Sequence, residues 1–428
     1  MLARYRRGPE RAVGLPVVSE RAAVTQGTTP AGFPTAALLV LALAVFTNIS
    51  VEMLPMGLLL PMSRELEVGE GAIGLLVTIF AFTVVASSTT LVRLTRRVPR
   101  HLLVTTVLVV FAASCFGSAL APDYAWSVAF RVIGGIVHGI FWTVVGAYAA
   151  YLVQPHQLAR AVAITSAGGS FAYVLGLPLA TLLGQVIGWR WSFALFGVVC
   201  LVVAVAVWRL LPAVDHLRDR ATTSTGSIAL PDPEPGKSLR GVALAIISTT
   251  LVMLGHYALY TYISPFLVDH AGVPEAWLSG ALFGYGIVGI GAVLAIALWL
   301  GRRPTASTLA MMVAGLAAML ALGVSQHVVL TVAAVLVWAF ALGALPALLQ
   351  TRQLQATPER MLQGATAWYT TGFNIGIGAG ALLGALVLEA AGVGALPWIL
   401  FAGLAIALVL VGADALLHRR DVARRAST

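Results

Sequence analysis

Hydrophobic residues run along this chain in long blocks, and short polar stretches separate one block from the next. Twelve blocks approach the roughly 20 apolar residues that a helix needs to cross a bilayer. Their approximate cores are 36–60, 72–92, 102–121, 126–149, 161–187, 191–211, 241–263, 277–300, 305–324, 328–349, 362–388 and 397–417. The pattern therefore predicts an all-α membrane protein with twelve transmembrane helices.

The longest internal polar stretch divides these helices six and six. It covers residues 213–239 and is rich in Thr, Ser, Gly and Pro, a composition typical of flexible linkers. We therefore expect five parts: a disordered N-terminal tail at 1–33, a six-helix half at 34–212, the linker at 213–239, a second six-helix half at 240–418, and a short tail at 419–428.

Small residues repeat between the two halves at a constant offset of 204 positions. They are Ala161, Gly168, Gly176 and Gly188 in the first half, and Ala365, Gly372, Gly380 and Gly392 in the second. Repeated six-helix units related by an axis along the membrane normal form a transporter architecture, with the substrate site between the units. The sequence thus predicts two pseudo-symmetric halves.

The basic residues indicate how the chain lies in the membrane. Of the 26 Lys and Arg residues, Arg64 and Arg190 fall on one side, Arg131 lies inside a block, and the rest share the side of the N-terminus. Because Lys and Arg are enriched in cytoplasmic loops, both termini should be cytoplasmic. This loop-by-loop distribution also argues that the net charge of +9 does not indicate nucleic-acid binding.

The composition gives no sign of a cofactor. Cys115 and Cys200 lie inside apolar blocks, and no Cys/His spacing suggests a metal site. The chain also has no nucleotide-binding loop, and no nucleophile–base pair stands at a water-accessible end of a helix. We expect neither a cofactor nor an enzymatic activity. No signal peptide is evident in the first 33 residues.

One acidic residue, Glu52, lies inside the first apolar block. A charged side chain near the bilayer centre costs roughly 2.5–3.5 kcal/mol on insertion scales. Asn48, Glu52 and Pro55 are spaced i, i+4, i+7 and share one helix face. We interpret that face as the lining of a polar cavity; a structural hydrogen bond between helices is the other interpretation.

The fourth block places Arg131, Gly135, His138 and Trp142 on one helix face. Arg131 should lie roughly 8 Å below the outer end of its helix and Glu52 roughly 12 Å below its own. Charged groups at similar depth can pair, which lowers the cost of burying both. We therefore predict that Glu52, Arg131 and His138 couple transport to protons, although His138 could instead be a packed, neutral histidine.

In the second half, His256 follows Glu52 by 204 residues, and Tyr260 lies on the same face as His256. No arginine repeats Arg131 there, so the second half suits a weakly polar or amphipathic solute. For each aromatic residue, packing or interfacial anchoring is an open alternative. The predicted substrate-binding residues are Asn48, Trp142, His256, Tyr260, Trp338 and Asn374.

Two stretches are candidates for gating. In the fifth block, Gly176, Pro178 and Gly184 can allow close helix contact and a hinge, although packing alone would also explain them. The connection between the second and third blocks contains Arg97 and Arg100. It acts as an orientation signal, and we hypothesise that it also acts as a gating latch.

These residues resemble motifs of the major facilitator superfamily, and the resemblance covers nearly the whole chain after residue 33. The basic 93–100 connection lies where that family has Gly-x-x-x-Asp-Arg-x-Gly-Arg-Arg, with Arg96 at the Asp position and Pro99 at the second Gly position. Arg131-Val-Ile-Gly-Gly is similar to the family's fourth-segment arginine motif, which is implicated in proton coupling. The stretch from Gly176 to Gly184 is similar to a degenerate antiporter motif.

Three further stretches, 52–61, 138–142 and 188–190, resemble the drug:proton antiporter branch, notably bacterial arabinose/sugar efflux, purine nucleoside efflux and chloramphenicol-resistance permeases. The resemblance implies a monomeric exporter of a drug, sugar or nucleoside in the bacterial inner membrane, driven by protons through alternating access. Its partners would be the solute, protons and the lipid bilayer. A proton-coupled symporter, an uncoupled facilitator and a non-transporting sensor are the alternatives.

Overall fold

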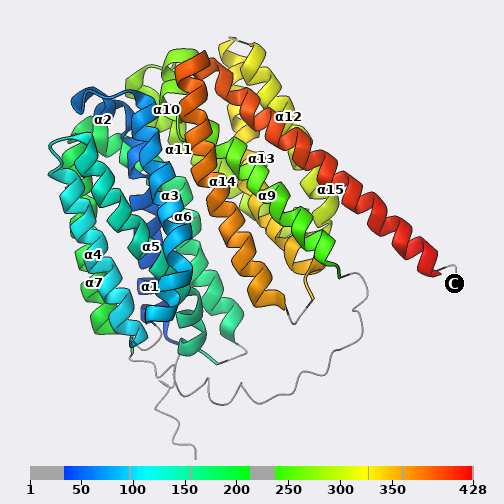
Figure 1. Ribbon diagram of the computed structural model, residues 1–428, viewed down its shortest axis with the longest axis horizontal. Coiled ribbons are helices and arrows are strands. Elements are labelled where there is room, and N and C mark those ends of the chain that lie inside the picture. Colours follow the sequence, from blue (N-terminus) through cyan, green and yellow to red (C-terminus); the bar gives the residue numbers. More distant parts are fainter. Residues whose placement is uncertain are drawn as a thin grey trace, which may run out of the picture. The chain divides into compact units, whose positions relative to one another are not determined.

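The computed structural model describes residues 33–95, 98–154, 157–212, 237–325, 327–358 and 361–426. All of the predicted tail at 1–33 except residue 33, and most of the predicted linker at 213–239, lie outside these residues. The long helices are α1 (Thr35–Gly57), α3 (Glu70–Leu94), α4 (Arg100–Ala119), α5 (Tyr124–Leu152), α6 (Leu158–Val186), α7 (Trp189–Leu210), α9 (Leu239–Tyr260), α11 (Leu278–Leu298), α12 (Pro304–Val324), α13 (Val328–Ala356), α14 (Leu362–Ala391) and α15 (Leu396–Ala426) (Figure 1).

Twelve helices in the described part of the chain are long and apolar enough to cross a membrane. No strand occurs in the same residues. The prediction of an all-α membrane protein with twelve transmembrane helices is therefore confirmed. Short helical elements connect some of the spans: α2 (Leu59–Glu65), α10 (Ile263–Pro265), a π-helix η3 (Phe266–His270), and the 3₁₀ turns η4 (Glu275–Trp277), η5 (Leu300–Arg302) and η7 (Val393–Ala395).

The two halves use the same helix pairs. In the first half α1 packs on α6 and α7, and α4 packs on α7; in the second half α9 packs on α14 and α15, and α12 packs on α15. Gly188 and Gly392, two of the repeated glycines, each precede the last long helix of their half with φ of 81° and 77°. Side chains rarely adopt this left-handed backbone, so the repeat has a conformational reason.

Contacts between the halves involve α3 with α14 and α6 with α11 (Figure 1). The Thr78 hydroxyl donates to the carbonyl of Gly378 at 3.0 Å, and the Tyr262 hydroxyl lies against Gly74. A Cβ on Gly286 would lie 2.4 Å from the carbonyl oxygen of Val174. Small residues thus let α6 and α11 approach backbone to backbone.

Several boundaries differ from the sequence prediction. The first span ends at Gly57 rather than near residue 60, and the chain then continues in the separate short helix α2. Both α13 and α15 extend past their predicted apolar cores, to Ala356 and Ala426. Arg352, in the extension of α13, donates to Asp414 near the end of the predicted core of α15 at 3.0 Å. Hydrophobicity locates the apolar core of a helix, but it does not show this polar pairing between two helices.

Candidate functional site

Glu52 lies in the last two turns of α1 and faces α5. Its Oε2 atom is 3.6 Å from Nε2 of His138, and the side chains of Glu52 and His138 are 14% and 4% exposed. The ring of Phe80 in α3 packs edge-on against His138, with centroids 5.0 Å apart. An acidic group and an imidazole are therefore held side by side in an apolar setting.

Trp142 determines which ring nitrogen of His138 carries the hydrogen. Its indole Nε1 donates to Nε2 of His138 at 2.9 Å, one turn earlier on α5. An indole N–H only donates, so Nε2 must offer its lone pair, and the ring hydrogen sits on Nδ1. A neutral His138 then presents an acceptor toward Glu52. An ionised Glu52 carboxylate would face a lone pair, whereas a protonated carboxyl group avoids that repulsion.

Arg131 contacts the main chain of α1 and not the Glu52 carboxylate. Its two terminal nitrogens donate to the carbonyl oxygens of Val51 at 3.2 Å and Glu52 at 2.9 Å. In a helix the Val51 carbonyl would accept from the N–H of residue 55, which is Pro55 and has none. The expected ion pair is thus wrong for this structure, because a proline leaves a backbone acceptor that the guanidinium occupies.

Arg131 also lies over an aromatic face, with its Cζ atom 4.3 Å from the centroid of the Phe80 ring. One turn before Glu52, Asn48 is fully buried, and neither polar atom of its side chain has a hydrogen-bond partner in the described residues. Buried polar atoms are usually satisfied. The neighbourhood of Glu52 is therefore polar in composition but incompletely hydrogen-bonded.

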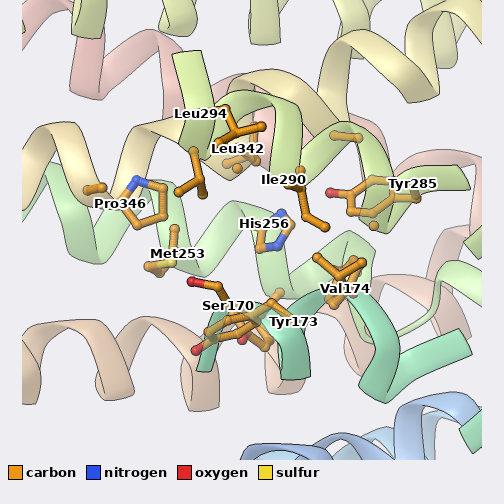
Figure 2. A pocket seen from close by; sticks show the side chains of 18 of the residues that line it. Ser170, Tyr173, Val174, Met253, His256, Tyr285, Ile290, Leu294, Leu342 and Pro346 are labelled. Atoms are coloured by element: carbon orange, nitrogen blue, oxygen red, sulfur yellow. The ribbon is translucent and has the colours of Figure 1, made fainter. Parts of the chain in front are cut away.

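A cavity of about 280 Å³ lies between α6 of the first half and α9, α11, α13 and α14 of the second (Figure 2). Ser170 and Tyr173 line it from α6, and His256, Tyr257 and Tyr260 line it from α9. The remaining lining is largely aliphatic, and none of the described residues in it carries a charged side chain. The cavity suits an uncharged, largely apolar solute.

His256 stands in the middle of this cavity, with Tyr285 to one side (Figure 2). It stacks on Tyr260, with centroids 4.9 Å apart and an interplanar angle of 19°. The indole of Trp338, which is fully buried in α13, donates from Nε1 to Nδ1 of His256 at 3.3 Å. In each half of the protein, a tryptophan thus donates a hydrogen bond to one ring nitrogen of a histidine and sets its tautomer.

The Glu52 cluster and the cavity are connected through packed helices. Glu52 belongs to α1, which packs on α6, and Ser170 and Tyr173 of α6 line the cavity. The carboxyl belongs to the first half, while most of the cavity wall belongs to the second. A movement of α1 together with α6 would therefore involve both the acid and the cavity wall.

Comparison with known proteins identifies the family. A sequence model described as Major Facilitator Superfamily matches residues 41–361. The chain belongs to the major facilitator superfamily. It is 30% identical to a probable sugar efflux transporter of Mannheimia succiniciproducens, over 82% of this chain and 87% of the relative. It is 32% identical to a chloramphenicol efflux pump of Mycobacterium tuberculosis, over 82% of this chain and 86% of the relative.

The fold of this major facilitator chain is also similar to solved structures. A bacterial homolog to the human lysosomal transporter Spinster, in an inward-facing and unoccupied conformation, matches with a TM-score of 0.65. The sequences are 16% identical, and the match covers 92% of this chain and 96% of that chain. The predicted resemblance to the family and its twelve-helix fold of two six-helix halves are therefore confirmed.

In this major facilitator protein, the predicted substrate residues fall in different places. His256 and Tyr260 line the cavity, and Trp338 supports His256 from behind. Trp142 belongs to the Glu52 cluster, and Asn374 donates to the Thr370 carbonyl of its own helix. The described cavity lining does not include Trp142, Asn374 or the buried Asn48. Their predicted roles in binding remain predictions.

The predicted gating residues of α6 lie along its contact with α1. A Cβ on Gly176 would come 3.2 Å from the Ser50 hydroxyl, and one on Gly184 would come 2.5 Å from the end of the Leu58 side chain. The helix continues unbroken through Pro178. Arg100 begins α4, and Arg97 lies outside the described residues.

A charged cluster links the halves at the α2 end of the bundle. Arg64 of α2 forms an ion pair with Glu275 of η4, whose carbonyl oxygen also accepts from Gln185 of α6. Close by in the chain, Glu65 accepts from Trp189 at 2.6 Å and from Arg190 at 2.8 Å. Sequence reasoning used Arg64 only to orient the chain, and Arg190 for the orientation and the family resemblance. It predicted neither ion pair, because a pairing such as that of Arg64 across 211 positions leaves no local pattern.

Sequence reasoning also missed Tyr173, Tyr285 and Phe80. Tyr285 carries the only polar group in Phe283-Gly284-Tyr285-Gly286, an isolated hydroxyl in an apolar span that could have marked it. Tyr173 offered the same signal within the small residues of the fifth block. Nothing in the sequence distinguishes Phe80 from a packing residue, because its role depends on Arg131 and His138 above and beside its ring.

Proposed function

We propose that this protein exports a small uncharged organic solute from a bacterial cell and drives the export with protons that enter through Glu52. The observation that carries the proposal is the position of Glu52. It is a mostly buried carboxyl group beside His138, on a helix that packs against the cavity-lining helix α6. Ionisable residues inside a membrane protein commonly mark proton pathways.

Glu52 suits the role of proton carrier better than His138. The bond from Trp142 occupies Nε2 of His138, so His138 cannot take a proton there without losing that bond. Glu52 can be neutral when it is shielded from water and ionised when water reaches it, and the Arg131 guanidinium is held at the Glu52 carbonyl. A change of exposure between two conformations would therefore bind and release one proton.

The direction of transport is supported by the relatives, whose names describe sugar efflux and chloramphenicol efflux. The distribution of Lys and Arg supports cytoplasmic termini, and the bacterial relatives support a position in the inner membrane. On that orientation the Arg64–Glu275 pair lies at the outer end and ties the halves together there. We propose that this pair opens when solute leaves, that the protein acts as a monomer, and that it is a transporter without cofactor or enzymatic activity.

The test uses purified protein in liposomes with an imposed pH gradient. We expect solute to move against its gradient in exchange for protons, and an uncoupler to abolish this movement. Glu52→Gln mimics the protonated carboxyl and should stop uphill exchange while keeping substrate binding. Glu67→Gln, in the connection between α2 and α3, is the control and should exchange as the unaltered protein does.

The outcomes separate the alternatives. Uphill exchange at full rate in Glu52→Gln would remove Glu52 from the mechanism. Solute and protons that move in the same direction would show a symporter. Downhill flux unaffected by the uncoupler would show a facilitator, and specific binding without any flux would show a sensor.

A further inference from the structure

The hydrogen-bonding pattern around His256 defines what the cavity can recognise. Trp338 donates to Nδ1, and an indole N–H has no acceptor capacity, so Nδ1 carries no hydrogen. In neutral histidine the hydrogen then sits on Nε2, and protonation of Nδ1 would break the Trp338 bond. His256 lines the cavity, and the described residues provide no hydrogen-bond acceptor for Nε2. His256 thus offers the cavity a hydrogen-bond donor.

Aromatic rings surround this donor. Tyr260 stacks on His256, and Tyr285 lies 5.5 Å from Tyr260 and 5.1 Å from Trp338, centroid to centroid. Figure 2 shows His256 between Tyr285 and the aliphatic side chains of the opposite wall. Flat faces of this kind favour stacking with a ring of the solute, in addition to the burial of its apolar surface.

The charge and size of the cavity further restrict the class of solute that it can bind. None of the described lining residues carries a carboxylate, so an organic cation would lose its water without gaining a counter-ion from them. Of its 19 described lining residues, six carry a polar side-chain group and the other 13 do not, so a sugar with hydroxyls on every side would leave some of them without partners. A volume of about 280 Å³ is close to the lower end of the usual range for small-molecule sites, roughly 300–1,000 Å³.

We propose that this cavity binds an uncharged solute with one aromatic ring, which places an acceptor oxygen against the Nε2 hydrogen of His256. The proposal rests on the proposed function only in taking this cavity as the place where the transported solute binds. It assigns His256 as the specificity-determining donor. Trp338 acts through His256 as a positioning residue.

The experiment measures equilibrium binding of radiolabelled chloramphenicol to the purified full-length protein in lipid nanodiscs. Chloramphenicol is neutral and joins a nitrophenyl ring to an amide. Its deacylated amine keeps the ring but carries a positive charge, and arabinose is neutral without a ring. We expect saturable binding, with the amine competing about tenfold more weakly and arabinose failing to compete. Equal or better competition by either compound, or no saturable binding, would overturn the proposal.

Variants then test the donor. His256→Leu should weaken chloramphenicol binding about tenfold, and His256→Gln, whose amide can donate, should recover to within about threefold. Trp338→Phe keeps a ring but lets Nδ1 take the hydrogen, so it should reduce the preference for chloramphenicol over the amine. Trp208→Phe, on α7 away from the cavity lining, is the matched indole control and should keep that preference. Unchanged binding and preference in both His256→Leu and Trp338→Phe would overturn the proposal.

This test is separable from that of the proposed function. Protein that binds chloramphenicol as expected, but never exchanges solute for protons, would contradict the transport proposal alone. Proton-driven export of a sugar without binding of chloramphenicol would contradict the assignment of His256 alone. Elution of each variant as a single species in size-exclusion chromatography separates loss of binding from loss of folding.

Discussion

Arg131 donates to the carbonyl oxygen of Val51, the acceptor that Pro55 leaves without a helical donor. The guanidinium is almost fully buried and makes a second bond to the Glu52 carbonyl, so it is held against the main chain of α1. The Glu52 carboxyl, one residue further, is left next to His138. Proline in α1 therefore keeps the positive charge close to the acid without a direct bond to it.

Replacing Pro55 with alanine should change the pH dependence of transport. The alanine would supply an N–H to the Val51 carbonyl, which competes with Arg131 and frees the guanidinium to pair with the Glu52 carboxylate. Pairing favours the ionised acid, so protonation then needs a lower pH. We expect the pH profile of proton-driven exchange to move down by about one unit, equivalent to about 1.4 kcal/mol. An unchanged profile in folded protein would show that Pro55 does not control this contact.

Arg131→Lys should not replace arginine. The guanidinium reaches two carbonyls while lying over the Phe80 ring, and one ammonium group cannot reproduce this planar fork. We expect Arg131→Lys to lose most exchange activity, and Arg131→Ala to lose more than Glu52→Gln, because it leaves the buried acid without a nearby positive charge. Initial rates of exchange in liposomes measure this. Full activity of Arg131→Lys would mean that only the charge is required.

Gly286→Ala should block the contact between the halves. The new Cβ would lie 2.4 Å from the Val174 carbonyl oxygen, so α11 would have to move away from α6. We expect transport to fall at least about tenfold in protein that still folds. Gly284→Ala is the matched control, because a Cβ there meets open space. If both variants transport solute equally well, this contact does not need to close during the cycle.

Arg64 and Glu275 can be tested as a pair. Their side chains are 64% and 47% exposed, so each single change to Gln should shift the balance between closed and open states by only about 0.2–1 kcal/mol. The exchange Arg64→Glu with Glu275→Arg should restore the original balance, while either single reversal should not. Spin-label distances between α2 and η4 report the two states. Identical distance distributions in all variants would show that the pair does not hold the halves together.

The orientation can be tested with single cysteines. Native Cys115 and Cys200 are buried, so impermeant thiol reagents should not reach them in intact cells. A cysteine at Glu67 should be labelled from outside, whereas cysteines at Arg97, Thr223 or Thr428 should be labelled only after lysis. Labelling of position 223 in intact cells would invert the proposed topology, and with it the assignment of Arg64–Glu275 to the outer end.

The sequence by itself determined the number and approximate position of the membrane helices. A helix that crosses a bilayer must be apolar over its length, and that requirement is local. The sequence also showed that Glu52, Arg131 and His138 are unusual, because each places a polar group inside an apolar block. The sequence also showed that Gly188 and Gly392 repeat between the halves. Both adopt a left-handed backbone, a local requirement that glycine meets.

The tertiary structure alone decided which of these groups touch. Depth along a helix could not tell whether Arg131 meets the carboxyl or the carbonyl of Glu52, because that depends on helix rotation and on the acceptor exposed by Pro55. Nor could it show that Trp338, 82 positions from His256, fixes the hydrogen of that ring. Hydrophobicity constrains each helix separately, whereas a site made by several helices depends on how their side chains pack.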